Sequence, residues 1–94
     1  MLTSRGQPQQ LELFPIAVRL TKVVPKRNQW RFYLMQTTRT LFGEWSLMRE
    51  WGRIGSPGHV QLETHDSMDG AIQALVAARH AKERRGYRAS MGGR

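Results

Sequence analysis

The feature that most constrains the fold of this chain is a change in the spacing of its apolar residues near residue 67. Before that point, short segments alternate apolar and polar residues, a period of two that is typical of β-strands. After it, Met68, Ile72, Leu75 and Val76 recur at intervals of three and four, the period of an α-helix. The chain is therefore expected to build a sheet first and a single helix afterwards.

Four segments carry the strand pattern. The predicted strands are residues 16–22, 30–37, 45–51 and 59–63. The third strand places Trp45, Leu47, Arg49 and Trp51 on one face, whereas large apolar groups on both faces of the second strand leave its inner face undecided. A basic turn that starts at Pro25 is expected at 25–28, and a glycine- and proline-containing turn at 54–58.

The helix is expected to run from Met68 to about residue 85. Asp66 or Ser67 can cap its first turn, and Gly86 stands where a left-handed residue ends a helix. Because four strands precede one helix, the predicted fold is α+β: a four-stranded antiparallel meander with one C-terminal helix packed on one face.

The length of 94 residues indicates one domain, which we expect to span residues 14–88 between flexible tails at 1–13 and 89–94. The absence of cysteine excludes disulfide scaffolds, iron–sulfur clusters and thiol catalysis. No apolar run approaches the roughly 20 residues that span a bilayer, and the N-terminus has no apolar secretion signal. A cytoplasmic protein without a membrane partner is therefore expected.

The charge is strongly basic. Lys and Arg number 15 against 7 Asp and Glu, a formal net charge of +8, and 12 of the basic residues are Arg. The planar guanidinium matches phosphate and carboxylate groups with two hydrogen bonds. A small basic domain of this kind is typical of nucleic-acid binders, although net charge alone does not determine the partner.

No arrangement in the sequence indicates catalysis. His59, His65 and His80 have no metal-ligand spacing, and the glycines at 52–58 form neither a P-loop nor a dinucleotide motif. No nucleophile, base and oxyanion donor come together. We therefore expect a protein that is not an enzyme, with no catalytic residue, no metal site and no cofactor.

The most informative cluster surrounds Trp51. Arg49 and Arg53 flank the tryptophan, and Gly52 would let the backbone approach a ligand closely. The indole can stack on a sugar or base, and Arg53 can contact a phosphate. Equally, a strand tryptophan can belong to the core and Gly52 can simply permit a bend. The residues themselves leave both interpretations open.

The same residues resemble a known family. The resemblance is carried by Trp51-Gly52-Arg53-Ile54-Gly55, Phe32-Tyr33, Phe42-Gly43-x-Trp45, Arg49 and Arg85-Gly86-Tyr87. Together, over residues 16–88, they resemble the WGR domain. That family occurs in eukaryotic poly(ADP-ribose) polymerases and in bacterial proteins, including short stand-alone ones that this chain resembles most. The resemblance implies an antiparallel sheet with one helix, and recognition of DNA strand-break ends without catalysis by this domain.

By that resemblance, Trp51 would pack on the terminal nucleotide and Arg53 would make a polar contact. The predicted nucleic-acid-binding residues are Trp51, Gly52, Arg53, Arg49, Lys26, Arg27 and Arg31. DNA is the favoured ligand over RNA, with strand ends or breaks as candidate targets. Two alternatives stay open: an acidic protein partner docking on the same surface, and single strands stacking on Trp30, Trp45 and Trp51.

Overall fold

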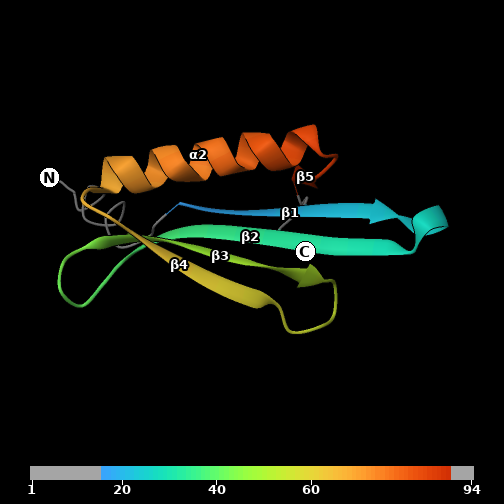
Figure 1. Ribbon diagram of the computed structural model, residues 1–94, viewed down its shortest axis with the longest axis horizontal. Coiled ribbons are helices and arrows are strands. Elements are labelled where there is room, and N and C mark those ends of the chain that lie inside the picture. Colours follow the sequence, from blue (N-terminus) through green and yellow to red (C-terminus); the bar gives the residue numbers. More distant parts are fainter. Residues whose placement is uncertain (1–15, 90–94) are drawn as a thin grey trace, which may run out of the picture.

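The computed structural model describes residues 16–89, so the predicted tails lie outside the described residues except for Ala89. Its elements are β1 (Ala17–Val24), the 3-10 turn η1 (Pro25–Arg27), β2 (Gln29–Arg39), β3 (Trp45–Arg53), β4 (His59–His65), α2 (Met68–Arg84) and β5 (Arg88–Ala89). The strands form one antiparallel sheet in the order β4-β3-β2-β1-β5, with α2 on one face (Figure 1). The predicted meander with one helix is confirmed, and β5 adds a short fifth strand.

The strand ends differ from the prediction in one consistent way. Each of the first four strands continues two residues beyond its predicted end, to Val24, Arg39, Arg53 and His65. Backbone pairing decides these ends, because Val24 still pairs with Gln29 and Arg53 with Arg31. Side-chain alternation does not report this pairing.

The core lies between the sheet and α2. Leu20 of β1 pairs with Tyr33 of β2, and Tyr33 pairs with Trp51 of β3, so these side chains share the face that α2 covers. Leu75 of α2 packs against this face, together with Ala74 and Ala78. The inner face of β2, which the sequence left undecided, is therefore the one that carries Tyr33.

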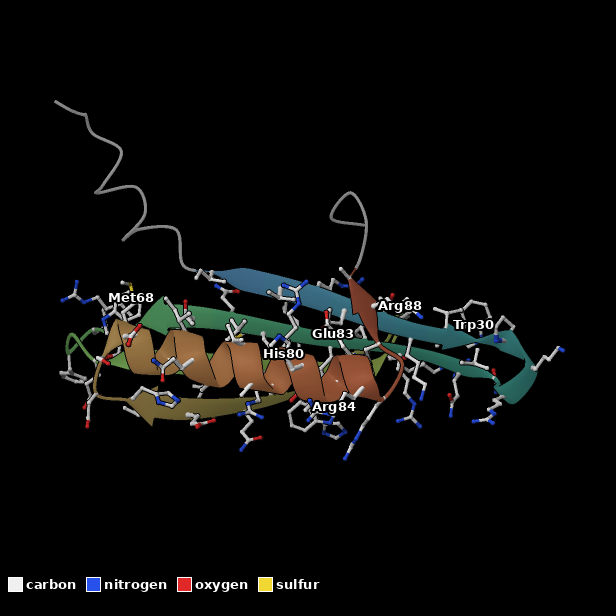
Figure 2. The ribbon with its side chains drawn as sticks, turned by 90° about the horizontal axis from the view of Figure 1, so that it is seen from above. Trp30, Met68, His80, Glu83, Arg84 and Arg88 are labelled. Atoms are coloured by element: carbon white, nitrogen blue, oxygen red, sulfur yellow. The ribbon has the colours of Figure 1, made fainter. Side chains whose placement is uncertain are left out.

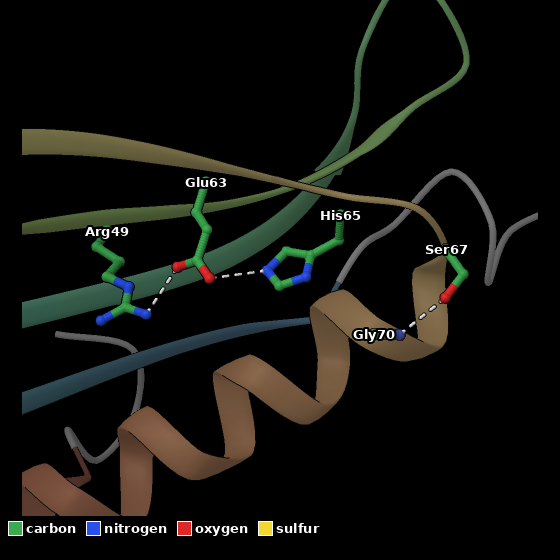
Figure 3. A network of polar contacts seen from close by, with 5 residues as sticks. All are labelled: Arg49, Glu63, His65, Ser67 and Gly70. Atoms are coloured by element: carbon green, nitrogen blue, oxygen red, sulfur yellow. Dashed lines mark hydrogen bonds and ion pairs between the residues drawn. The ribbon is translucent and has the colours of Figure 1, made fainter.

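Both ends of the helix have defined caps. Ser67 accepts a hydrogen bond at its Oγ from the Gly70 amide at 3.0 Å, so Ser67, and not Asp66, is the N-cap (Figure 3). At the other end, Gly86 has a φ of +98°, as a left-handed residue after a helix requires. The helix ends at Arg84, one residue before its predicted end.

The helix covers only part of the sheet. The strands near η1, around Trp30, extend beyond the C-terminal end of α2 (Figure 2). Tyr87 lies at the limit of the part that α2 covers. Its side chain is buried, and its ring stands edge-on to that of Tyr33, with the ring centroids 6.3 Å apart. Beyond Tyr87 the face of the sheet is open, and the candidate site lies there.

Candidate functional site

Trp51 stands at the boundary between the core and the open part of the sheet. It is half-buried, and its ring stacks on Tyr33 with centroids 5.8 Å apart and an interplanar angle of 17°. His59, its pairing partner on β4, lies 5.9 Å away with a tilted ring. Trp51 also lines an open cleft of about 420 Å³. The ring thus packs on the core and borders the cleft, so features of both earlier interpretations are present.

Arg53 lies in the same cleft and is held by the β1–β2 turn. Its Nη1 donates to the carbonyl oxygen of Asn28 and its Nη2 to the Oδ1 of Asn28, both at 3.1 Å. Asn28 can present both oxygens because it adopts a left-handed conformation, with a φ of 55°, directly after η1. These acceptors are neutral, so they orient the guanidinium and leave its charge uncompensated.

A row of like charges crosses the sheet at this level. Lys22 of β1 pairs with Arg31 of β2, and Arg31 pairs with Arg53 of β3, so the three cationic residues occupy one row. Like charges directly opposite one another on neighbouring strands destabilise a sheet. The row therefore costs stability unless an anion occupies it.

Two cations from the end of the helix face the same region. Lys82 and Arg85 line a second cleft of about 230 Å³ together with Lys22 and Arg31. Burial lowers the pKa of Lys82, and the nearby charges of Arg85, Arg49 and Arg31 lower it further. The negative end of the helix dipole offsets part of this repulsion. Within residues 16–89, no carboxylate lines either cleft.

Arg49 has a different environment. Its Nη2 donates to Glu63 Oε1 at 2.9 Å, and His65 Nε2 lies 3.2 Å from the other oxygen of that carboxylate (Figure 3). Burial works to lower the pKa of Arg49, but Tyr33 and Glu63 outweigh it, so that pKa is raised. The charge of Arg49 is thus compensated within the fold, and the side chain lines neither cleft.

Of the remaining predicted residues, some line a cleft and others do not. Arg31 lines both clefts and Gly52 lines the larger one, beside Trp51 and Arg53. Lys26 and Arg27 are exposed in η1 and line neither cleft. Trp51, Gly52, Arg53 and Arg31 are therefore brought together, whereas Arg49, Lys26 and Arg27 lie apart from them.

Gly52 also has a role in packing. A Cβ atom at Gly52 would lie 3.2 Å from the Cα of Gly58 and 3.5 Å from the Phe32 ring. Gly58 is tighter still, because a Cβ there would lie 2.8 Å from both Phe32 and the Trp51 carbonyl oxygen. The turn after β3 thus folds closely against the strand on the face opposite α2, and this approach requires small residues.

Sequence reasoning missed several residues of the clefts: Lys22, Asn28, His59, Lys82, Arg85 and Tyr87 line them but were not predicted as site residues. Lys82 and Arg85 stand at the C-terminal end of the helix, where cations are favourable to the helix dipole whether or not they bind a ligand. Lys22 could have been found only from the register that aligns it with Arg31, which depends on the hairpin geometry.

Comparison with known proteins bears directly on this arrangement. The family model for the WGR domain matches residues 16–94. The chain belongs to the WGR domain family. "Uncharacterized protein y4dW" of Sinorhizobium fredii (strain NBRC 101917 / NGR234) is 32% identical to this WGR domain over 74 residues. The match covers 79% of this chain and 36% of that protein, so the chain spans about a third of its relative's length. No solved structure matches.

WGR domains are generally nucleic-acid-binding modules in proteins related to the poly(ADP-ribose) polymerases, and they bind without catalysing a reaction. Two structural findings accompany this assignment. In the described part of this WGR domain, no helix is long and apolar enough to cross a membrane. Among residues 16–89, no group of three or more His, Asp or Glu side chains could hold a metal ion.

Proposed function

We propose that this protein is a non-enzymatic DNA-binding module whose ligand occupies the cleft lined by Trp51 and the second cleft, which shares Arg31 and Tyr87 with it. The observation that carries the proposal is the row of Lys22, Arg31 and Arg53, which are aligned on neighbouring strands with no carboxylate in the clefts that they line. Like charges opposite one another are unfavourable by themselves, and bound phosphates offset their repulsion.

Each part of the site has a distinct task in this proposal. Trp51 presents an aromatic surface already positioned by Tyr33, so stacking on a sugar or base costs little side-chain entropy. Arg53, oriented by Asn28, contacts a phosphate next to the stacked nucleotide. Arg31, Lys22, Lys82 and Arg85 extend the phosphate-binding surface towards the end of α2.

Three of the predicted residues take secondary roles. Lys26 and Arg27 lie on the exposed turn next to Asn28, where they can contact a longer duplex. Arg49 is not a phosphate ligand in this proposal, because Glu63 already satisfies its charge. Strand ends are the proposed target, on the strength of the family resemblance. Binding should tolerate sequence changes, since helix α2 packs on the sheet and does not present a recognition surface.

The test is a titration of fluorescent blunt, nicked and overhanging duplexes, and of single strands, at two salt concentrations. We expect binding that weakens steeply with salt, with a log–log slope of about −0.9 per phosphate contacted. Arg31→Ala should lower the magnitude of the slope by about 1. Arg39→Ala is the matched control, since it removes the same charge at the opposite end of β2, where Arg39 pairs with Trp45.

Absence of binding to every nucleic acid at about 50 mM salt would contradict the proposal, because phosphate contacts are strong under that condition. The alternative is an acidic protein partner, since carboxylates also fit the aligned guanidinium groups. A protein partner lost with Arg53→Ala, while DNA binding stays unchanged, would favour that alternative.

A further inference from the structure

The two edges of the sheet are protected very differently. One edge is β5, which has only two residues, Arg88 and Ala89, and carries an exposed charge. The other edge is β4, whose seven residues include no Lys, Arg or Pro. Short strands, charged side chains (above all Lys) and proline are usual devices that prevent an edge from pairing with another chain. Strand β4 is seven residues long and has no Lys, Arg or proline, and Arg49 of the same sheet already pairs with its one acidic side chain, Glu63.

Two of the three side chains of β4 on the face opposite α2 are apolar and accessible, and the third is Thr64. Val60 is 58% exposed and Leu62 is 66% exposed. Leu62 pairs with the half-buried Met48 of β3, so an apolar surface runs from the interior of the sheet to its edge. A further strand laid along β4 would cover this surface and use the outward backbone groups of β4.

We propose that β4 is the contact through which two copies of this chain associate. Antiparallel pairing of β4 with β4 would join the two sheets into one continuous sheet, with both helices on the same side. A two-fold axis at Leu62, the central residue of the strand, uses all seven residues of each copy. It sets Leu62 against Leu62, Val60 against Thr64, and Gln61 against Glu63.

This register is chemically self-complementary. On one face Leu62 meets Leu62 and Val60 meets Thr64, and on the other the Gln61 amide can donate to the Glu63 carboxylate of the second copy. Centring the pair on Glu63 would place two carboxylates directly opposite each other, which is unfavourable. The register centred on Leu62 avoids this contact and keeps all seven residues of each copy paired.

The distribution of charge and the difference between the two sheet edges also favour a dimer. Each chain carries a net charge of +8, so two copies repel unless they meet where basic residues are absent. The cations of the two clefts come from β1, β2, β3, α2 and the residue after α2, and none comes from β4. The short charged β5 at the opposite edge opposes further growth, so association should stop at a dimer.

The first measurement is the mass of the unaltered chain by light scattering over a range of concentrations. We expect it to rise from the monomer value of 10.9 kDa towards twice that value. Leu62→Lys should hold the protein at the monomer mass while its circular dichroism stays unchanged, because it places a charge on the edge. A mass that remains monomeric up to about 1 mM protein would overturn the proposal.

The second measurement uses the absence of native cysteine. In the proposed register, Leu62→Cys lies opposite its own copy with Cα atoms about 4.5–5.5 Å apart, a separation that a disulfide can bridge. Oxidation should therefore give a covalent dimer. Val76→Cys is the matched control, because Val76 is 42% exposed on α2, away from the edge.

Two outcomes of the oxidation experiment would count against the proposal. Equal rates of cross-linking for Leu62→Cys and Val76→Cys would overturn the β4 contact. Faster cross-linking of Val60→Cys than of Leu62→Cys would overturn the proposed register, since Val60 should face Thr64. Neither measurement involves nucleic acid, so this proposal stands or fails independently of the proposed function.

Discussion

Arg49 and Arg53 are the same residue type on the same strand, on the same face of the sheet, and on either side of Trp51, yet their environments differ. Arg49 has a carboxylate 2.9 Å from its guanidinium. Arg53 instead donates to the two neutral oxygens of Asn28. Two arginines that look equivalent in the sequence are therefore a structural ion pair in one case and a candidate ligand-binding group in the other.

The topology of the sheet explains the difference. Strand β4 runs beside β3 only as far as Trp51, whose pairing partner is His59. Arg49 therefore has β4 as a neighbour and receives Glu63 from it, whereas Arg53 lies beyond the end of β4. Because β4 ends at this point, it supplies no carboxylate to Arg53, which lies at the open part of the sheet next to Arg31 and Lys22.

The largest effect on stability and DNA affinity is expected from Trp51→Ala, which removes the ring between Arg49 and Arg53. We expect the free energy of unfolding to fall by about 2–4 kcal/mol, because a half-buried indole stacked on Tyr33 is lost. DNA affinity should fall by about 1–3 kcal/mol in addition. Urea unfolding and duplex titration measure the two effects. Trp51→Phe should keep most of the stability, and equal DNA affinity for Trp51→Ala and the unaltered chain would remove the stacking role.

The direct comparison is Arg53→Ala against Arg49→Ala. Arg53→Ala should weaken DNA binding by about 1–2 kcal/mol, or about tenfold in Kd, with little change in stability because Arg53 is exposed. Arg49→Ala should keep most of the DNA affinity but lower stability by about 1–2 kcal/mol, since Glu63 and Tyr33 lose their partner. A larger loss of affinity for Arg49→Ala would reverse the assignment of the two roles.

A smaller effect is expected from Glu63→Gln, which makes the surroundings of Arg49 resemble those of Arg53. The variant keeps the size of the side chain and removes its charge. Stability should fall by about 0.5–1 kcal/mol, a modest amount because the Glu63 side chain is 40% exposed. Thermal unfolding would measure it, with Glu44→Gln in the exposed β2–β3 turn as control. An unchanged melting temperature would mean that the ion pair contributes nothing.

The smallest expected effect is a change in the pKa of Lys82 when DNA binds. Burial and neighbouring cations lower the pKa of Lys82 in the free protein, so its charged form is disfavoured there. Bound phosphates favour the charged form, and DNA binding should therefore raise the pKa of Lys82. Affinity should correspondingly fall as the pH rises through that pKa. Side-chain NMR titration with and without duplex measures the shift, and an unchanged pKa would place Lys82 outside the binding surface.

Much of the fold could be predicted because it depends on local patterns. The four main strands, their antiparallel order, the helix from Met68 and the glycine at its end all follow from periodicity and capping chemistry. The two-residue β5 carries no periodic signal, and it forms only because the chain after Gly86 returns beside β1. A segment this short depends on its tertiary neighbours alone.

The candidate site was predictable only in part, for a related reason. The cluster of Trp51, Gly52 and Arg53 is continuous in the chain, so sequence reasoning found it. Lys22 and Lys82 lie far from it in sequence and reach it through strand register and helix placement. The sequence could not distinguish the surroundings of Arg49 from those of Arg53, because the carboxylate beside Arg49 comes from another strand.

The sequence by itself determined the class of fold, the basic character of the chain and the motif of its family, since these depend on composition and on residues that are neighbours in the chain. Only the tertiary structure decided which charges are compensated and which strands form the two edges of the sheet within residues 16–89. Both depend on distances between strands, and Coulomb interactions and backbone pairing act across those distances whatever the separation along the chain.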